Sequence, residues 1–188
     1  MSKRIIGIAG SLRSGSFNAA LLRAAQEECP AGTTLEIESI RGIPLYDGDV
    51  EAADGLPKAV VDLKARIVAA DALLLVTPEY NNGIPGVFKN SIDWLSRPPG
   101  DIKKVFGGRA VALIGASPGG FGTILAQEAW LPVLRTLGTR PWFGGRLMAS
   151  RAQTLFSTEG VLTDDALRKQ LTDFVQGFAS FIAAGAAR

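Results

Sequence analysis

The chain has 188 residues, of which 47% are hydrophobic and 20% charged, and its formal net charge is +2. This composition excludes a disordered chain and predicts one globular domain over residues 1–188. The charge gives no basis for nucleic-acid binding, and no run of about 20 apolar residues predicts a membrane span. The lone cysteine, Cys29, allows no internal disulfide, which fits a reducing compartment and leads us to expect the cytoplasm.

Strand and helix patterns alternate along the chain. Strands are predicted over residues 5–9, 35–40, 72–76 and 109–116, with a weaker fifth one within 140–148. Helices are predicted over residues 18–28, 57–70, 85–97, 121–137 with a kink or break near Pro132, and 164–184 with Thr163 as N-cap. Residues 41–49 are rich in turn formers and are expected to form a long loop. This alternation predicts a parallel sheet covered on both faces, with ligands at the carboxyl ends of its strands.

The junction between the first strand and the first helix is small, polar and positively charged. Residues 10–18 are Gly-Ser-Leu-Arg-Ser-Gly-Ser-Phe-Asn. The first N–H groups of a helix lack partners within the helix, and the helix dipole favours an anion there. Together with Ser11, Arg13 and Ser16, these N–H groups predict a phosphate site. A solvated turn with Asn18 as the helix N-cap is the alternative.

Two common nucleotide motifs are disfavoured at this junction. Gly10 and Gly15 have the glycine spacing of a P-loop, but Ser16-Phe17 stands where that motif needs Lys followed by Ser or Thr. Gly7 and Gly10 have the wrong separation for a dinucleotide fingerprint. What remains suits a mononucleotide phosphate, because charge-assisted hydrogen bonds contribute about 1.5–3 kcal/mol each.

The loop after the third strand, residues 77–86, combines an aromatic ring, two amides and a carboxylate between two prolines. A planar ring could lie here, with backbone and amide groups recognising its polar edge. An ordinary surface loop in which Tyr80 packs on a helix is the alternative. Glu79 has no histidine or lysine close to it in the sequence, so a role as general base is disfavoured.

The loop after the fourth strand, Ser117–Gly122, consists mostly of small residues. Gly119 and Gly120 either let a ligand approach the backbone closely or serve only the turn from strand to helix, and the sequence leaves both open. Asp47 and Asp49 indicate a solvated turn rather than a cation site, since no further ligands accompany them.

Few other side chains offer reactive groups. The chain has no histidine, and Cys29, at a helix end, is interpreted as inert. The tryptophans Trp94, Trp130 and Trp142 are assigned to the core or to a subunit contact rather than to electron transfer. We therefore expect a bound cofactor to bring the reactive atoms.

Four stretches of the chain resemble the NADPH-dependent FMN reductases of flavodoxin-like fold, the group that contains bacterial chromate, quinone and azo-dye reductases. In chain order they are GSLRSGSFN (10–18), IPLYDGDVE (43–51), TPEYNNGIPGVFKNSIDWLSRP (77–98) and GASPGGFG (115–122). The resemblance covers nearly the full length. Residues 140–157 are less recognisable, which leaves the acceptor pocket and subunit contacts undefined.

The resemblance implies an α/β three-layer sandwich with a doubly wound, five-stranded parallel sheet of order 2-1-3-4-5. It also implies FMN as cofactor and NADPH or NADH as hydride donor. The FMN phosphate would be held by Ser11, Arg13, Ser16, Phe17 and Asn18. The isoalloxazine ring would be bordered by Pro78, Glu79, Tyr80 and Asn81, and closed on the opposite rim by Ser117, Gly119 and Gly120. No metal ligand is assigned.

The activity implied by this resemblance is ping-pong electron transfer, with hydride passing from the nicotinamide to flavin N5 and onward to a small acceptor. Quinones, azo dyes, chromate and free flavin are the acceptors expected. The resemblance also implies a homodimer or homotetramer, with the third predicted helix and Trp94 as candidate contact surface. A non-enzymatic flavodoxin-type carrier is the alternative, although such carriers are usually strongly acidic. A nucleotide-sensing protein with a vacant loop is a further one.

Overall fold

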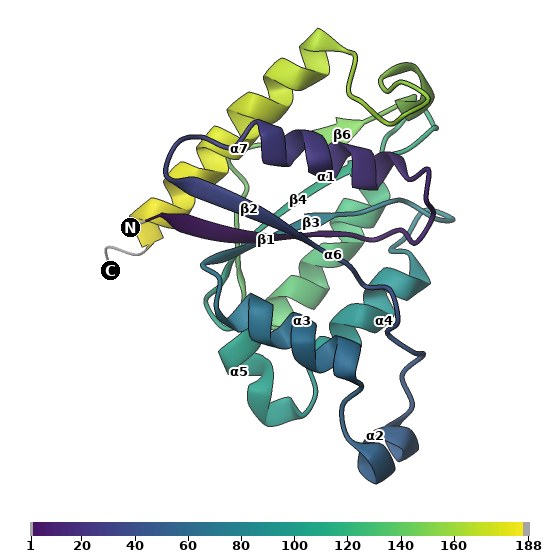
Figure 1. Cartoon of the computed structure of the whole chain (residues 1–188), viewed down its shortest axis with the longest axis vertical. Helices are drawn as coiled ribbons and strands as arrows, with labels where there is room; N and C mark the ends of the chain where they lie inside the picture. The colour runs from purple at the N-terminus through teal and green to yellow at the C-terminus, as the bar shows by residue number, and fades with distance from the viewer. Residues whose placement is uncertain (1, 186–188) are drawn as a thin grey trace.

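A computed structural model describes residues 2–185, and within them six strands form one parallel sheet (Figure 1). The expected 1–188 domain thus includes four terminal residues that lie outside the described part. The strands follow the order β2-β1-β3-β4-β5, with β6 pairing to the other half of β4. Their bounds are β1 (Lys3–Ala9), β2 (Thr33–Glu38), β3 (Ala72–Val76), β4 (Ala110–Ala116), β5 (Arg140–Pro141) and β6 (Leu147–Ala149). The predicted strand order is confirmed.

Helices cover both faces of this sheet, as Figure 1 shows. One apolar core lies between the sheet and the helices α1 (Phe17–Glu27) and α7 (Asp165–Gly185). The second lies on the opposite face, under α3 (Lys58–Val68), α4 (Gly86–Leu95), α5 (Ile102–Val105) and α6 (Ile124–Thr136). The short helix α2 (Gly48–Asp54) extends from the bottom of the molecule and buries none of its residues. The 3₁₀ turns η1 (Pro99–Asp101) and η2 (Ala152–Thr154) complete the elements.

The fifth position of the sheet is shared by two short strands, where the sequence predicts one. β5 pairs with residues Ala110 and Val111 of β4, and β6 pairs with its last three residues. Pro141 has no N–H, but the residues on either side of it both donate to β4, so no hydrogen bond of the ladder is lost there. The glycines that follow carry no side chain to pack, and the chain leaves the sheet after Pro141 and rejoins it at Leu147.

Three further predictions needed correction, and one helix was missed. The predicted 41–49 loop ends earlier, because α2 begins at Gly48, where the carboxylate of Asp47 accepts a hydrogen bond from Asp49 N–H (2.9 Å) and caps the helix. Of the kink or break predicted near Pro132, the break is wrong: α6 is continuous through Pro132, and the carbonyl left without a donor lies on an exposed face. The cap of α7 is Asp164, whose Oδ1 accepts from Leu167 N–H (2.7 Å), and not Thr163. The short helix α5 was not predicted.

Two of the tryptophans lie in the core. Trp94 and Trp130 are both fully buried, and their indoles donate hydrogen bonds to Pro44 O (2.9 Å) and to the hydroxyl of Thr77 (3.2 Å). Trp94 is therefore not part of a subunit contact surface, which corrects that expectation. The indole of Trp142 is only partly buried and packs on α7.

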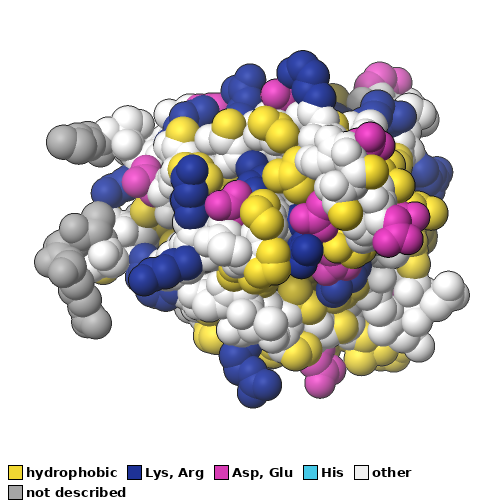
Figure 2. All heavy atoms as spheres, turned by 90° about the horizontal axis from the view of Figure 1, so that it is seen from below, with side chains coloured by type: hydrophobic (Ala, Val, Ile, Leu, Met, Phe, Trp, Pro, Cys, Tyr) yellow, Lys and Arg dark blue, Asp and Glu magenta, His cyan; other side chains and the backbone are white. Residues whose placement is uncertain are grey.

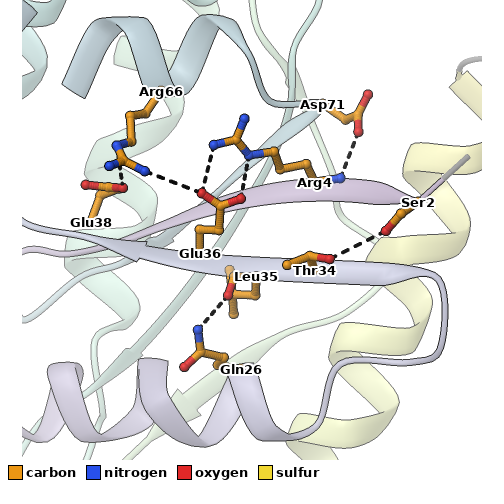
Figure 3. A network of polar contacts seen from close by, with 9 residues as sticks. All are labelled: Ser2, Arg4, Gln26, Thr34, Leu35, Glu36, Glu38, Arg66 and Asp71. Carbon is orange, nitrogen blue, oxygen red and sulfur yellow. Dashed lines mark hydrogen bonds and ion pairs between the residues drawn. The ribbon is translucent and has the colours of Figure 1, made fainter. Parts of the chain in front are cut away.

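A network of charges lies on the edge strand β2 and its neighbour β1 (Figure 3). Arg4 donates two hydrogen bonds to Glu36, at 2.6 and 2.8 Å, and this pairing holds the pKa of that carboxyl below its usual range. Arg66, from α3, lies 3.1 Å from Glu38 and 3.8 Å from Glu36. Charged side chains on an edge strand oppose pairing with another sheet.

The surface charge is mixed. Figure 2 views the molecule from the end that carries α2 and α5, and shows basic and acidic side chains interspersed over that face. None of the helices within residues 2–185 is long and apolar enough to cross a membrane.

Candidate functional site

The three loops singled out from the sequence meet at one edge of the sheet. They follow the carboxyl ends of the neighbouring strands β1, β3 and β4. Hydrogen bonds link their first residues to the adjacent strand: Gly10 N–H donates to Val76 O (2.9 Å), and Thr77 N–H to Ile114 O (2.8 Å). In sheets of this order, mononucleotides bind at the edge where the loops after the first and third strands separate.

The first loop, residues 10–16, turns from β1 directly into α1. A Cβ at Gly10 would overlap the ring of Phe88, so this position requires glycine. Ser16 is buried and caps α1, because its Oγ accepts a hydrogen bond from Ala19 N–H (3.2 Å). Asn18 lies inside the helix, so the alternative in which it is the N-cap is wrong.

Arg13 is the free cation of this loop. Its side chain is exposed, and its guanidinium forms no hydrogen bond or ion pair with any residue of 2–185. The hydroxyl of Ser11 lies close by and accepts from Arg13 N–H at 3.4 Å. Phe17 is only partly exposed, with its ring against that of Phe156 at a centroid separation of 6.0 Å. The loop thus presents one guanidinium and several hydroxyls beside a helix start.

Asn18 has a different role from the other residues assigned to the phosphate. Its side chain is 4% exposed and exchanges two hydrogen bonds with Ala116. The amide nitrogen donates to Ala116 O (2.8 Å), and Oδ1 accepts from Ala116 N–H (2.9 Å). Both polar ends of this side chain are engaged by the last residue of β4.

The second loop forms a tight hairpin at the sheet edge. Tyr80 N–H donates to Gly83 O (3.2 Å), and Gly83 N–H donates to Tyr80 O (3.1 Å). The two residues between them, Asn81 and Asn82, have φ values of 51° and 62°, as a type I′ turn demands. Asparagine adopts this left-handed conformation more readily than most residues. The hairpin leaves the Tyr80 side chain 46% exposed, whereas Pro78 at its base is buried.

Glu79, in the second loop, caps α6, the helix that follows the third loop. Its Oε2 accepts hydrogen bonds from Leu125 N–H and Ala126 N–H, both at 2.9 Å, in the first turn of α6. Thr123, at the N-cap position of that helix, provides no side-chain cap. The carboxylate thus lies at the positive end of a helix dipole, where a negative charge is stabilised.

The third loop is anchored at its start and open in its middle. Ser117 N–H donates to Ala149 O (2.9 Å), and Gly119 O accepts from Arg151 N–H (3.0 Å). A Cβ added at Gly120 would have no neighbour within 4 Å, and neither Gly119 nor Gly120 has a left-handed φ. The turn therefore does not require glycine at these two positions, which favours the ligand interpretation. Phe121 next to them is 85% exposed.

Some residues that shape this edge carried no signal in the sequence. Arg151 has a left-handed φ of 50° and supports the third loop from the poorly recognised segment 140–157. Gly122, by contrast, has a φ of 63°, and a Cβ there would lie 2.8 Å from Met148 O. Its glycine is required by the fold, and a turn signal could have found it.

Other ionisable side chains offer little to the site. Burial raises the pKa of the Cys29 thiol, which keeps it protonated, and it lies at the far end of α1. No group of three or more His, Cys, Asp or Glu that could hold a metal ion occurs within residues 2–185.

The geometry of this edge fits a flat, phosphorylated cofactor. The free guanidinium of Arg13 and the start of α1 suit an anion, while the exposed Tyr80 ring and the open backbone of Gly119 and Gly120 suit a planar ring. A cavity of about 330 Å³ beside the first loop is lined by residues 14–17 and 156–160 among others.

Comparison with known proteins agrees with this geometry. The family described as NADPH-dependent FMN reductase matches residues 3–154. An NAD(P)H-dependent FMN reductase of Pseudomonas aeruginosa is 44% identical over 179 residues, covering 95% of each chain. A 2-hydroxy-1,4-benzoquinone reductase of a Burkholderia species is 34% identical, covering 97% of each chain.

A solved structure is similar to this chain over nearly its full length. FerB, a flavoenzyme NAD(P)H:(acceptor) oxidoreductase from Paracoccus denitrificans, superposes with a TM-score of 0.86 at 33% identity, covering 97% of this chain and 98% of that one. These relatives are enzymes, which decides against the electron carrier and the vacant nucleotide sensor. The chain belongs to the NADPH-dependent FMN reductase family and is an FMN-dependent NAD(P)H oxidoreductase.

Proposed function

We propose that the three loops form the FMN site of a quinone-type reductase. The observation that carries this proposal is the exposed guanidinium of Arg13, which has no hydrogen bond or ion pair within residues 2–185. It lies in the loop that leads into α1, on the same sheet edge as Tyr80 and the exposed glycines 119 and 120. Residues 1–188 are proposed as one FMN-binding domain. In its support, α7 returns to pack on the same core as β1 and α1.

The residues divide into three roles in this proposal. Ser11, Arg13 and Ser16 hold the phosphate, together with backbone N–H groups at Phe17 and Asn18. Pro78, Tyr80 and Asn81 border the ring on one side, and Ser117, Gly119 and Gly120 on the other. The side chains of Asn18 and Glu79 are already engaged within the fold, so we assign them no direct contact.

The chemistry belongs to the cofactor and the positioning to the chain. When bound, FMN supplies hydride acceptance at N5 and onward electron transfer to the acceptor. In this proposal the nicotinamide and the acceptor use the same face of the ring, beside the exposed side chains of Tyr80 and Phe121. The donor therefore leaves before the acceptor enters, which is a ping-pong order.

A quinone is the acceptor we favour among the four expected, with azo dyes, chromate and free flavin as others to assay. A 2-hydroxy-1,4-benzoquinone reductase and quinone reductases are among the relatives at 34% identity. The exposed aromatic rings of Tyr80 and Phe121 also suit a flat acceptor.

Anaerobic titration of the purified protein with NADPH tests this function. The expected result is a flavin spectrum that bleaches on NADPH addition and returns on addition of a benzoquinone. Initial rates at several fixed quinone concentrations should give parallel double-reciprocal lines. A bound flavin that NADPH does not reduce, or lines that intersect, would contradict the activity or the kinetic order respectively.

Self-association through the surface beside α4 is part of the proposal. Leu45 is 82% exposed, while its neighbours Pro44 and Tyr46 are hydrogen-bonded to Asn90 of α4. Val87, one turn earlier on α4, is 38% exposed. Leu45→Glu should reduce the mass measured by light scattering from that of a dimer or tetramer. An unchanged mass would place the contact elsewhere.

A cytoplasmic location is the remaining part of the proposal. It is supported by the single cysteine, which permits no internal disulfide. Cell fractionation followed by immunodetection would test it, and recovery outside the cytoplasmic fraction would contradict it.

A further inference from the structure

Two side chains that sequence comparison would assign to cofactor contact hold the glycine-rich loop instead. Asn18 engages Ala116, the residue directly before this loop, and Glu79 engages Leu125 and Ala126, directly after it. We propose that Asn18 and Glu79 are positioning residues that fix the two ends of the 117–124 segment before any ligand binds. Where it concerns FMN affinity, this inference rests on the proposed function.

The bond pattern at the start of the segment identifies what Asn18 does. β3 ends at Val76, and Thr77 N–H still donates to Ile114 O, on the β3 side of β4. Alternate residues of a strand direct their N–H and C=O groups to the same side, so those of Ala116 also face the β3 side. The Asn18 amide satisfies both, and thus takes the place of the next residue of β3.

The far end of the segment is held by a charge. The first turn of α6 has N–H groups without intrahelical partners, and its own N-cap residue gives no side-chain bond. Glu79 supplies the acceptor from the second loop and so ties the hairpin that carries Tyr80 to the start of α6. The side chain is only partly exposed, which limits competition from water.

Between these two ends the segment is also held at Gly119, whose carbonyl accepts from Arg151 N–H, and at Gly122, which packs against Met148. Its open part is confined to Gly120 and Phe121. Gly120 has open space around it and Phe121 is 85% exposed. A loop with fixed ends and an open middle loses less conformational freedom when a ligand orders it. Asn18 and Glu79, together called the brace, should therefore raise the affinity for a ring bound against Gly119 and Gly120 without touching that ring.

Four variants separate positioning from direct contact. Glu79→Gln keeps an oxygen that can accept both N–H bonds, whereas Glu79→Ala removes the acceptor. Asn18→Asp has the same shape but directs an oxygen at Ala116 O, so it breaks one bond of the pair. Glu128→Ala is the matched control, because Glu128 is exposed on α6 and forms no hydrogen bond or ion pair with any residue of 2–185.

The first measurement is amide hydrogen exchange on the apoprotein, which does not depend on FMN. In Glu79→Ala the amides of Leu125 and Ala126 should exchange about tenfold faster or more, and in Glu79→Gln within about threefold of the parent. In Asn18→Asp the Ala116 N–H keeps its acceptor and only Ala116 O loses its donor, so the Ala116 amide should exchange within about threefold of the parent. If the Leu125 and Ala126 amides of Glu79→Ala exchanged at the same rate as in the parent, the proposal would be overturned even if FMN binding were lost.

The second measurement is the FMN dissociation constant, by fluorescence titration. It should rise about tenfold in Glu79→Ala and Asn18→Asp, and about twofold or less in Glu79→Gln and Glu128→Ala. An equal loss of affinity in Glu79→Gln and Glu79→Ala, with parental exchange in Glu79→Gln, would show direct contact and overturn positioning. Faster exchange with unchanged affinity would overturn the link to binding. A parent protein that binds no FMN would contradict the proposed function, and the exchange result would still decide the brace.

Discussion

Arg97 and Glu51 join two segments that are 46 residues apart. The Arg97 Nε donates to Glu51 Oε2 at 2.7 Å, linking a position two residues beyond the end of α4 to α2. The hydroxyl of Tyr46 donates to the same oxygen at 2.9 Å. These two hydrogen bonds, that from Arg97 above all, hold the pKa of the Glu51 carboxyl below its usual range.

This pairing predicts a pH-dependent contribution to stability. Because the pKa of Glu51 is lower in the folded than in the unfolded chain, its contribution is present above the unfolded pKa and is lost as pH falls through the folded pKa. The unfolding temperature of Glu51→Gln should therefore lie below that of the parent near neutral pH and converge with it in acid. Thermal unfolding across a pH series measures this. Glu27→Gln, at an exposed position on α1, should show no such convergence, and a constant difference for Glu51→Gln would contradict the assignment.

Removal of the Arg13 guanidinium should weaken FMN binding without affecting the fold. A charge-assisted hydrogen bond to a phosphate contributes about 1.5–3 kcal/mol, so the dissociation constant of Arg13→Ala should rise about 10- to 100-fold. Fluorescence titration of the apoprotein measures it. The unfolding temperature of the apoprotein should stay unchanged, because the side chain is exposed and unpaired within residues 2–185. Arg135→Ala, on the exposed side of α6, is the control; equal affinities in both variants would remove Arg13 from the phosphate site.

Tyr80 should affect catalysis more than cofactor retention. Aromatic contacts contribute about 0.5–1.5 kcal/mol, so kcat/KM for a quinone should fall about 2- to 10-fold in Tyr80→Ala. Tyr80→Phe keeps the ring and should stay near the parent value. The flavin reduction potential of the same variants, measured by spectroelectrochemistry, should shift in Tyr80→Ala. Parental kinetics and potential in Tyr80→Ala would exclude Tyr80 from the site.

Substitution by alanine should lower stability at one glycine of the third loop and FMN affinity at another. Gly122→Ala puts a Cβ 2.8 Å from Met148 O at a left-handed φ, a conformation that costs about 1–2 kcal/mol, and should lower the unfolding temperature by several degrees. Gly120→Ala has room for its Cβ and should keep the parental unfolding temperature while weakening FMN binding. Unchanged affinity in Gly120→Ala would indicate that no ligand approaches the backbone there.

Much of the fold was predictable because apolar runs and periodic helices are local signals. Ala72–Val76 is apolar throughout, and the structure makes it a strand buried on both faces. The α2 helix was not predictable in the same way. It buries none of its residues, and its Glu51 is bonded to Arg97, which follows α4 and is distant in sequence.

The candidate site, too, was predictable where local sequence signals suffice and not where a partner is distant in the sequence. The sequence located the three loops, since each is a polar or glycine-rich stretch that directly follows an apolar strand pattern. The roles of Asn18 and Glu79 could not be read from composition, because an amide or carboxylate in a polar loop looks the same whether it meets a ligand or a distant backbone. Only the three-dimensional structure shows that their partners are Ala116, Leu125 and Ala126.

The overlap between a Cβ at Gly10 and the ring of Phe88 has a consequence for how this protein can vary. Phe88 is fully buried and its ring lies edge-on to Trp130, with 5.0 Å between centroids, so it has no room to retreat. A larger residue at position 10 is tolerable only with a smaller one at position 88. In a library randomised at both positions, folded members should carry at most one large side chain between the two.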